Sequence, residues 1–251
     1  MCEGGGPIED RFGGRVLIVI PALNEAASVG SVVTEVRSVL PACDVLVVDD
    51  GSVDGTSMVA KAAGARVATL PFNVGVGGAM RLGFRYALSH SYDAVVQIDA
   101  DGQHRARDVG ALLKLLVSHD VVVGARFHPG SQFAVPLHRR MVMRFLAWLC
   151  SRATDTRMAD VTSGFRAHGR RAIAVYAQHY PLEYLGDTVE SLIIAKRCGL
   201  GIGETTVEMR PRQSGPASQS AASASRYVLR TIAAVAIGMT RDWTVKGEVL
   251  S

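Results

Sequence analysis

Asp99 and Asp101 stand two residues apart, directly after an apolar run, in the sequence Asp99-Ala100-Asp101-Gly102-Gln103-His104. Carboxylate and amide oxygens are the hard ligands that Mg²⁺ or Mn²⁺ takes, and these ions usually keep water and substrate phosphates as further ligands. Gly102 permits a bend that brings both carboxylates and the Gln103 amide to one ion. An Asp-x-Asp pair can also be ordinary turn chemistry. Its place at a central strand end favours a Mg²⁺ or Mn²⁺ site at Asp99, Asp101 and Gln103, where the ion would neutralise a diphosphate leaving group.

Two further clusters could hold a nucleotide. In Asp49-Asp50-Gly51-Ser52 a carboxylate can accept hydrogen bonds from a base N–H or a ribose hydroxyl, although Ser52 or Asp54 could instead cap a helix. In Asn73-Val74-Gly75-Val76-Gly77-Gly78 the glycines let backbone amides approach a phosphate at a helix N-terminus. Met80 replaces the third glycine of a dinucleotide motif, and the cluster follows the third strand, not the first. A nicotinamide site is therefore disfavoured.

The elements that must position these clusters alternate between buried apolar runs and amphipathic stretches. This pattern predicts an α/β fold with a doubly wound, mostly parallel sheet. In such sheets ligands bind beyond the carboxyl ends of the strands, where all of these clusters lie. The expected strands are 16–20, 45–48, 66–70, 94–98, 120–124 and 204–209. The expected helices are 26–40, 54–63, 76–89, 107–118, 137–152, 188–198 and 226–239.

Composition limits the function classes. The 251 residues are 48% hydrophobic and 20% charged, which predicts a globular chain with a substantial core. The net charge of +4 comes without a block of consecutive Lys or Arg, so nucleic-acid binding is not expected. The basic excess suits an anionic substrate, an anionic membrane surface or ordinary solvated charge. Four widely spaced cysteines without a CxxC pair argue against a zinc or redox motif and indicate a reducing compartment.

The domain boundaries follow from composition. We expect a flexible N-terminus over 1–14, a catalytic domain over 15–210, a mobile Pro/Ser/Ala-rich loop over 211–225, and a C-terminal helix and tail over 226–251. No signal peptide or run long enough to span a bilayer is recognised, so the chain is expected to be cytoplasmic, or peripheral on the cytoplasmic face of the membrane. The helix at 226–239 could pack on the domain, lie in the membrane interface or contact a membrane protein partner.

The motifs together resemble family 2 glycosyltransferases of GT-A fold. The motifs that carry the resemblance are Pro21-Ala22-Leu23-Asn24-Glu25, Val48 to Ser52, Asn73-Val74-Gly75, Asp99 to His104, Gly124-Ala125-Arg126, Asp160 to Arg166, and Arg212 with Gly215 and Ser218. Within the family, the chain most resembles the branch of dolichyl-phosphate mannose synthases and bacterial polyprenyl-phosphate glycosyltransferases. Several relatives in this branch carry transmembrane helices after the catalytic domain, and this chain has only the 226–239 segment there.

The resemblance implies roles for particular residues. The residues implied in donor nucleotide or diphosphate binding are Pro21, Glu25, Asp50, Gly75, Asp99 and Gln103. Asp101 is the implied catalytic metal carboxylate. Arg126, Arg140 and Arg212 resemble the basic residues that hold the acceptor phosphate or the donor diphosphate.

The implied function is an inverting, metal-dependent transfer of a sugar from a GDP- or UDP-sugar to a polyprenyl phosphate. A first alternative is transfer to a hydroxyl of a cell-envelope glycan or natural product, which would need a general base. Asp187 and Glu190 are the candidates, although Asp187-Thr188-Val189-Glu190 also matches a helix capping box. A second alternative is a non-catalytic subunit that binds nucleotide-sugars. A phosphatase of the haloacid-dehalogenase type is disfavoured, because its aspartate motif follows the first strand and here the motif follows the fourth.

Overall fold

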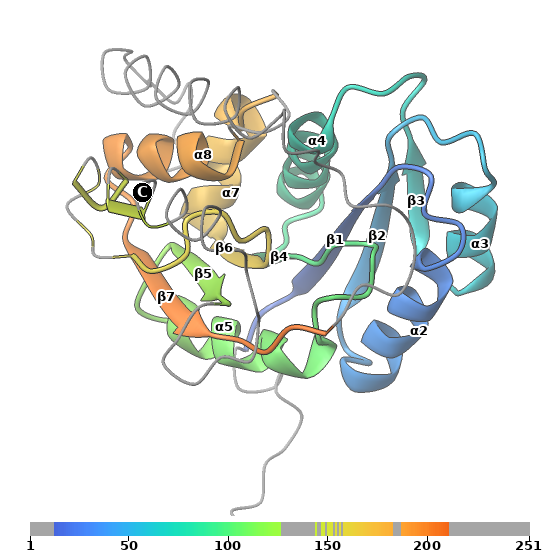
Figure 1. Cartoon of the computed structure of the whole chain (residues 1–251), viewed down its shortest axis with the longest axis horizontal. Coiled ribbons are helices and arrows are strands. Elements are labelled where there is room, and N and C mark those ends of the chain that lie inside the picture. The colour runs from blue at the N-terminus through green and yellow to red at the C-terminus, as the bar shows by residue number, and fades with distance from the viewer. Residues whose placement is uncertain are drawn as a thin grey trace, which may run out of the picture.

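The computed structural model describes residues 13–126, 158–182 and 187–210, together with 144, 147, 148, 150–152, 154 and 156. These residues form a seven-stranded sheet in the order β3-β2-β1-β4-β6-β5-β7 (Figure 1). The strands are β1 (Val16–Ala22), β2 (Asp44–Asp49), β3 (Arg66–Thr69), β4 (Ala94–Gln97), β5 (Val121–Ala125), β6 (Arg166–Gly169) and β7 (Ile202–Thr206). All neighbouring pairs are parallel except those made by β6, which runs antiparallel to both β4 and β5.

Helices cover both faces of the sheet, and each face has its own apolar core. The helices are α2 (Val29–Val39), α3 (Thr56–Ala62), α4 (Val76–Ser89), α5 (Val109–Leu116), α7 (Arg170–His179) and α8 (Asp187–Arg197), with a 3₁₀ turn at Ala106–Asp108. Buried side chains of α4, α7 and α8 pack on one face, and those of α2, α3 and α5 pack on the other. Figure 1 shows this arrangement, in which the sheet separates the two layers.

β1 lies inside the sheet, between β2 and β4, and its side chains alternate between the two cores. Leu17 and Val19 belong to the core under α4, whereas Val16, Ile18 and Ile20 belong to the core under α2. All five are buried, as expected of a strand covered on both faces. On the α4 side, a Cβ at Gly83 would lie 2.7 Å from Val19 Cγ1, so this glycine allows the helix to approach the strand closely.

The doubly wound, mostly parallel sheet is confirmed, and so is α4 with its expected bounds at 76 and 89. The second half differs from the expectation in two ways. The short strand β6 and helix α7 were not anticipated, and the last strand lies at 202–206, not at 204–209. Of the expected helix 137–152, the described residues 144, 147, 148 and 150–152 are helical. The segments 1–12 and 211–251, including the expected loop and final helix, lie outside the described residues.

None of the helices that the structure describes is both long enough and apolar enough to cross a bilayer.

Candidate active site

The carboxyl ends of β1, β2 and β4 surround a cavity of about 770 Å³. Six of the residues predicted for the site line it. They are Pro21, Glu25, Asp50, Gly75, Asp99 and Asp101. Pro21 belongs to the end of β1, and the others lie in the loops after β1, β2, β3 and β4, up to 80 positions away in sequence. These four strands are parallel neighbours, so their carboxyl ends lie at one edge of the sheet.

Asp50 builds the glycine-rich turn of this cavity. Its carboxylate is buried, and its two oxygens accept hydrogen bonds from the backbone N–H groups of Val74 and Gly75, each at 2.8 Å. Gly75 adopts a φ of +92°, which a side chain would strain. Asp50 therefore holds the loop after β3 against the end of β2, and it also lines the cavity.

The neighbouring Asp49 is turned into the β2–α3 connection. Its Oδ1 accepts from the backbone N–H of Ser52 at 2.9 Å, and its Oδ2 accepts from the Ser57 hydroxyl. Burial raises the pKa of the Asp49 carboxyl, but these hydrogen bonds outweigh burial and hold the pKa below its usual value. Ser52 Oγ in turn accepts from the Asn24 N–H at 2.8 Å, which ties the loops after β1 and β2 together.

Asp99 and Asp101 lie in a bent turn after β4, as their spacing predicts. This turn, residues 99–103, is called the acidic turn below. Gly102 has a φ of +75°, and across it Asp101 Oδ1 accepts from the Gln103 N–H at 3.1 Å. The Asp99 side chain is 40% exposed, so its carboxylate is open to a ligand. Gln103 is not among the residues that line the cavity, and its Nε2 lies 3.4 Å from the Arg210 carbonyl oxygen. Its role as a ligand stays a prediction.

His104 holds the backbone of Asp99 through a hydrogen bond. It is buried, its Nδ1 accepts from the Asp99 backbone N–H at 3.1 Å, and its ring stacks on Phe165 with centroids 4.8 Å apart. Because Nδ1 is the acceptor, the neutral ring carries its proton on Nε2, which lies 3.7 Å from Asp99 Oδ2. His104 therefore fixes the start of the acidic turn, a role that sequence reasoning did not assign.

The donor set at this turn fits Mg²⁺ or Mn²⁺. Within the described part of the chain, no group of three or more His, Cys, Asp or Glu side chains is placed to hold a metal ion. Two carboxylates nevertheless suffice for an ion that keeps waters and takes oxygens from a diphosphate. Asp99 and Asp101 both face the cavity, where such a diphosphate has room. A site shared between protein and substrate is thus consistent with these residues.

Arg126 follows β5 and is engaged with a buried carboxylate. Its Nε and Nη2 donate to the two oxygens of Asp160 at 2.7 and 3.0 Å, and Nη2 also donates to Thr162 Oγ1 at 2.7 Å. Burial raises the pKa of the Asp160 carboxyl, but the Arg126 guanidinium outweighs burial and holds the pKa below its usual value. The predicted contact of Arg126 with a phosphate is not tested by this geometry. Arg140 and Arg212 lie outside the described residues.

Gly164 was given no separate role by the sequence, and the structure places it against the acidic turn. A Cβ at this position would lie 3.0 Å from Gln97 Nε2 and 3.2 and 3.3 Å from the two oxygens of Asp99.

We expect Gly164→Ala to lower turnover by roughly tenfold, because changes that displace a metal-binding carboxylate commonly cost this much. Steady-state rates at fixed Mn²⁺ measure the effect.

The matched control is Gly201→Ala, at the other edge of the sheet, where an added Cβ has its nearest neighbour at 3.7 Å. This variant should turn over like the unmodified protein. Equal rates for the two alanine variants would contradict the predicted role of Asp99 in turnover.

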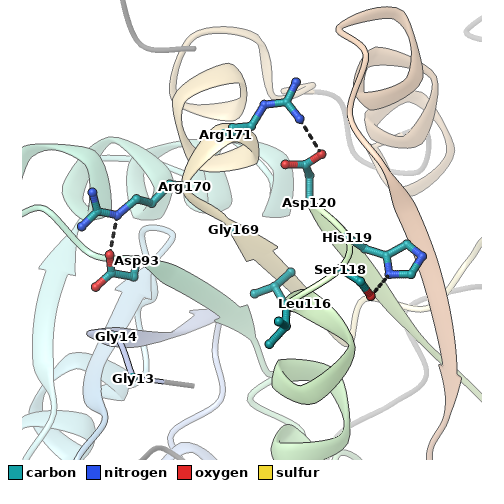
Figure 2. A pocket seen from close by; sticks show the side chains of 11 residues that line it. Gly13, Gly14, Asp93, Leu116, Ser118, His119, Asp120, Gly169, Arg170 and Arg171 are labelled. Carbon is teal, nitrogen blue, oxygen red and sulfur yellow. Dashed lines mark hydrogen bonds and ion pairs between the residues drawn. The ribbon is translucent and has the colours of Figure 1, made fainter. Parts of the chain in front are cut away.

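A second cavity, of about 580 Å³, lies at the amino ends of the strands (Figure 2). Its charged side chains pair with each other, Arg171 with Asp120 at 3.0 Å and Arg170 with Asp93. None of the predicted site residues that the structure describes lines it. The candidate active site is therefore the cavity at the carboxyl ends.

Solved structures with a similar fold include two sugar-phosphoglycerate synthases. Mannosyl-3-phosphoglycerate synthase from Rubrobacter xylanophilus matches 91% of this chain and 75% of its own, with a TM-score of 0.70 and 22% identity. Glucosyl-3-phosphoglycerate synthase from Mycobacterium tuberculosis matches 94% of this chain and 85% of its own, with a TM-score of 0.68 and 24% identity. The fold is thus the GT-A fold of glycosyltransferases.

The sequence comparisons narrow this class. The profile described as "Glycosyl transferase family 2" matches residues 17–177, and the chain belongs to this family of glycosyltransferases. An undecaprenyl-phosphate mannosyltransferase of Micrococcus luteus is 30% identical over 213 residues, which cover 82% of this chain and 88% of that protein. A polyprenol monophosphomannose synthase of Mycolicibacterium smegmatis is 32% identical over 178 residues, which cover 68% of this chain and 67% of that protein.

Proposed function

We propose that this enzyme transfers a sugar from a GDP- or UDP-sugar to a polyprenyl phosphate, with inversion at the anomeric carbon and with Mg²⁺ or Mn²⁺. The observation that carries the proposal is the cavity at the strand ends, which Asp50, Gly75, Asp99 and Asp101 line together. The activities of the Micrococcus and Mycolicibacterium relatives support the choice of acceptor.

The acceptor chemistry suits a site without a dedicated base. A polyprenyl phosphate is already anionic at neutral pH, so its oxygen can attack the anomeric carbon directly. One carbon–oxygen bond forms to the acceptor as the bond to the diphosphate breaks, and the nucleoside diphosphate leaves with the electron pair. A bound divalent cation would supply charge neutralisation to that leaving group.

The protein's own residues would orient the reactants. Pro21, Glu25 and Asp50 are assigned to the nucleotide, and Gly75 to the phosphate side of the cavity. Asp99, Asp101 and Gln103 are assigned to the ion and the diphosphate. Arg126, Arg140 and Arg212 are assigned to holding the anionic groups in position, which offsets the repulsion between two phosphates.

The site of action follows from the acceptor. A lipid phosphate lies in a membrane, so we place the enzyme at the cytoplasmic face, either on the lipid surface or against a membrane protein partner. The C-terminal segment 226–251 is the assigned contact.

The test is a donor panel. Purified protein is incubated with GDP-mannose, UDP-glucose or a UDP-N-acetylhexosamine, together with undecaprenyl phosphate and Mg²⁺ or Mn²⁺, and lipid-linked sugar is measured. We expect one donor to give product and chelator to abolish it. Sugar transfer only to hydroxyl acceptors would move the assignment to glycan synthesis, with Asp187 or Glu190 as the base. Donor binding without turnover on any acceptor would instead indicate a non-catalytic subunit.

A further inference from the structure

Glu35 lies on α2, and its carboxylate joins two segments that are distant in sequence. Its Oε2 accepts from Arg210 Nη1 at 2.6 Å, and its Oε1 accepts from Arg210 Nη2 at 3.1 Å. Oε1 also accepts from the backbone N–H of Ala106 at 3.2 Å. Because both oxygens are used, the carboxylate fixes the guanidinium and the backbone in one arrangement.

The described chain after β7, up to Arg210, is hydrogen-bonded to the acidic turn and to the residue after it. The Arg210 N–H donates to the Gln103 carbonyl at 2.9 Å, and Met209 forms an antiparallel bridge with His104. The Gln103 side chain reaches the Arg210 carbonyl at 3.4 Å. The backbone at Gln103 and just after it is thus held by Arg210, through the Gln103 carbonyl, and by Glu35, through the Ala106 N–H.

The ion pair between Glu35 and Arg210 joins two elements that follow strands far apart in the sheet. Helix α2 follows β1, the third strand in the order, whereas Arg210 follows β7, the last. Figure 1 shows the chain after β7 running back across the molecule toward α2. The acidic turn after β4 lies between them, and the contacts of Glu35 and Arg210 reach it at Gln103 and in the chain just after it.

We propose that Glu35 is a positioning residue for the metal-binding turn, acting through Arg210 and the backbone of Ala106. It does not line the cavity, and the lining residues of the cavity include both acidic-turn carboxylates. The inference rests on the proposed metal-dependent function. Its physical basis is that groups which hold a ligand from outside set how closely its oxygens approach an ion.

The matched pair of variants is Glu35→Gln and Glu208→Gln. Glu208 also ties the two segments together, because its carboxylate accepts from Arg105 and from Arg107 Nη2, the latter at 2.7 Å. Its side chain is 62% exposed, against 27% for Glu35, and within the described part of the chain its carboxylate contacts these arginines and not the backbone of the acidic turn. Glutamine at either position removes one charge and keeps the length of the side chain.

Mn²⁺ binding in the presence of UDP or GDP, followed by electron paramagnetic resonance, is the first measurement. We expect Glu35→Gln to weaken Mn²⁺ roughly tenfold, as is typical when a supporting carboxylate is lost, and Glu208→Gln to bind like the unmodified protein. Amide hydrogen exchange at Ala106 and Arg210 should become faster in Glu35→Gln alone.

The turnover readout separates positioning from general destabilisation. The loss of rate in Glu35→Gln should be recovered at high Mn²⁺, whereas a loss of folded enzyme would persist at any Mn²⁺ concentration. Unchanged Mn²⁺ affinity in Glu35→Gln, or equal weakening in Glu208→Gln, would overturn the proposal.

The experiment also distinguishes this inference from the proposed function. If the unmodified protein binds Mn²⁺ and nucleotide but transfers no sugar, the function is wrong and the Mn²⁺ affinities of the two variants still decide the role of Glu35. If the unmodified protein binds no Mn²⁺ with either nucleotide, both proposals fall.

Discussion

Asp101→Ala is expected to abolish turnover while the fold stays intact. Asp101 lines the cavity after β4, and its carboxylate faces the space assigned to the donor diphosphate. On the proposed assignment, losing one of the two carboxylates of the ion removes several kcal/mol of stabilisation from a departing diphosphate, so turnover should fall by at least ~10³-fold. Steady-state product formation, with circular dichroism to check the fold, measures the effect.

Asp101→Asn sharpens this test, because asparagine can keep the hydrogen bond that Asp101 Oδ1 accepts from the Gln103 N–H. The turn geometry is then retained and the charge alone is lost. Asp93→Asn is the matched control, since Asp93 lines the cavity at the opposite edge and pairs with Arg170. Full activity of Asp101→Asn, or equal losses in both asparagine variants, would contradict the assignment of Asp101 to the ion.

The first half of the fold was predictable because its signals are local and agree with one another. The apolar run Val16–Ile20 indicates a buried strand, and the glycine-rich start of α4 coincides with a stripe of apolar residues. Parallel strands then require that the polar residues after each strand meet at one edge. The convergence of Pro21, Asp50 and Asp101 on one cavity follows from topology alone.

The second half was less predictable because its signals are non-local. β6 has only four residues, Arg166–Gly169, and begins with an arginine, which is rarely found buried. Its place between β4 and β5 depends on pairing with strands distant in sequence. β7 begins at Ile202, and the flanking glycines Gly201 and Gly203 weaken the strand signal there.

In the candidate site, too, the residues with local sequence signals were predicted and those that depend on non-local contacts were not. The residues that line the cavity were identified from strand ends, whereas their supports were not. His104 was read only as part of a motif, and Glu35 was given no role. Their roles depend on hydrogen bonds to Asp99 and to Arg210, which spacing does not reveal.

Arg166 organises the segment that leads into Gly164 beside the acidic turn. Its side chain is fully buried, and it donates four hydrogen bonds at 2.8 to 2.9 Å. The acceptors are the carbonyl oxygens of Ser163, Thr188 and Val161 and the hydroxyl of Ser191. No carboxylate among the described residues pairs with it, so neutral dipoles alone solvate the buried charge.

Arg166→Met is therefore expected to destabilise the protein strongly. Methionine relieves the burial of a charge but takes the Arg166 donors away from the carbonyl oxygens of Val161 and Ser163, at about 1–3 kcal/mol for each buried group that stays unsatisfied, whereas the Thr188 carbonyl still accepts from the Ser191 hydroxyl. The cost of the unsatisfied carbonyl oxygens exceeds the gain from no longer burying a guanidinium charge. We therefore expect a net loss of ~3 kcal/mol in the free energy of unfolding. Urea denaturation followed by fluorescence measures this change.

Arg166→Lys separates the charge from the hydrogen bonds. Lysine keeps the charge, but its single ammonium has three donors and cannot reach four acceptors spread over two segments. If the hydrogen bonds dominate, the lysine variant should be destabilised almost as much as the methionine variant, and activity should fall as well, because the 161–163 loop leads into Gly164 beside Asp99. If Arg166→Met were as stable as the unmodified protein, burial of the charge would be the larger cost, and the hydrogen bonds of Arg166 could not be what holds this loop in place.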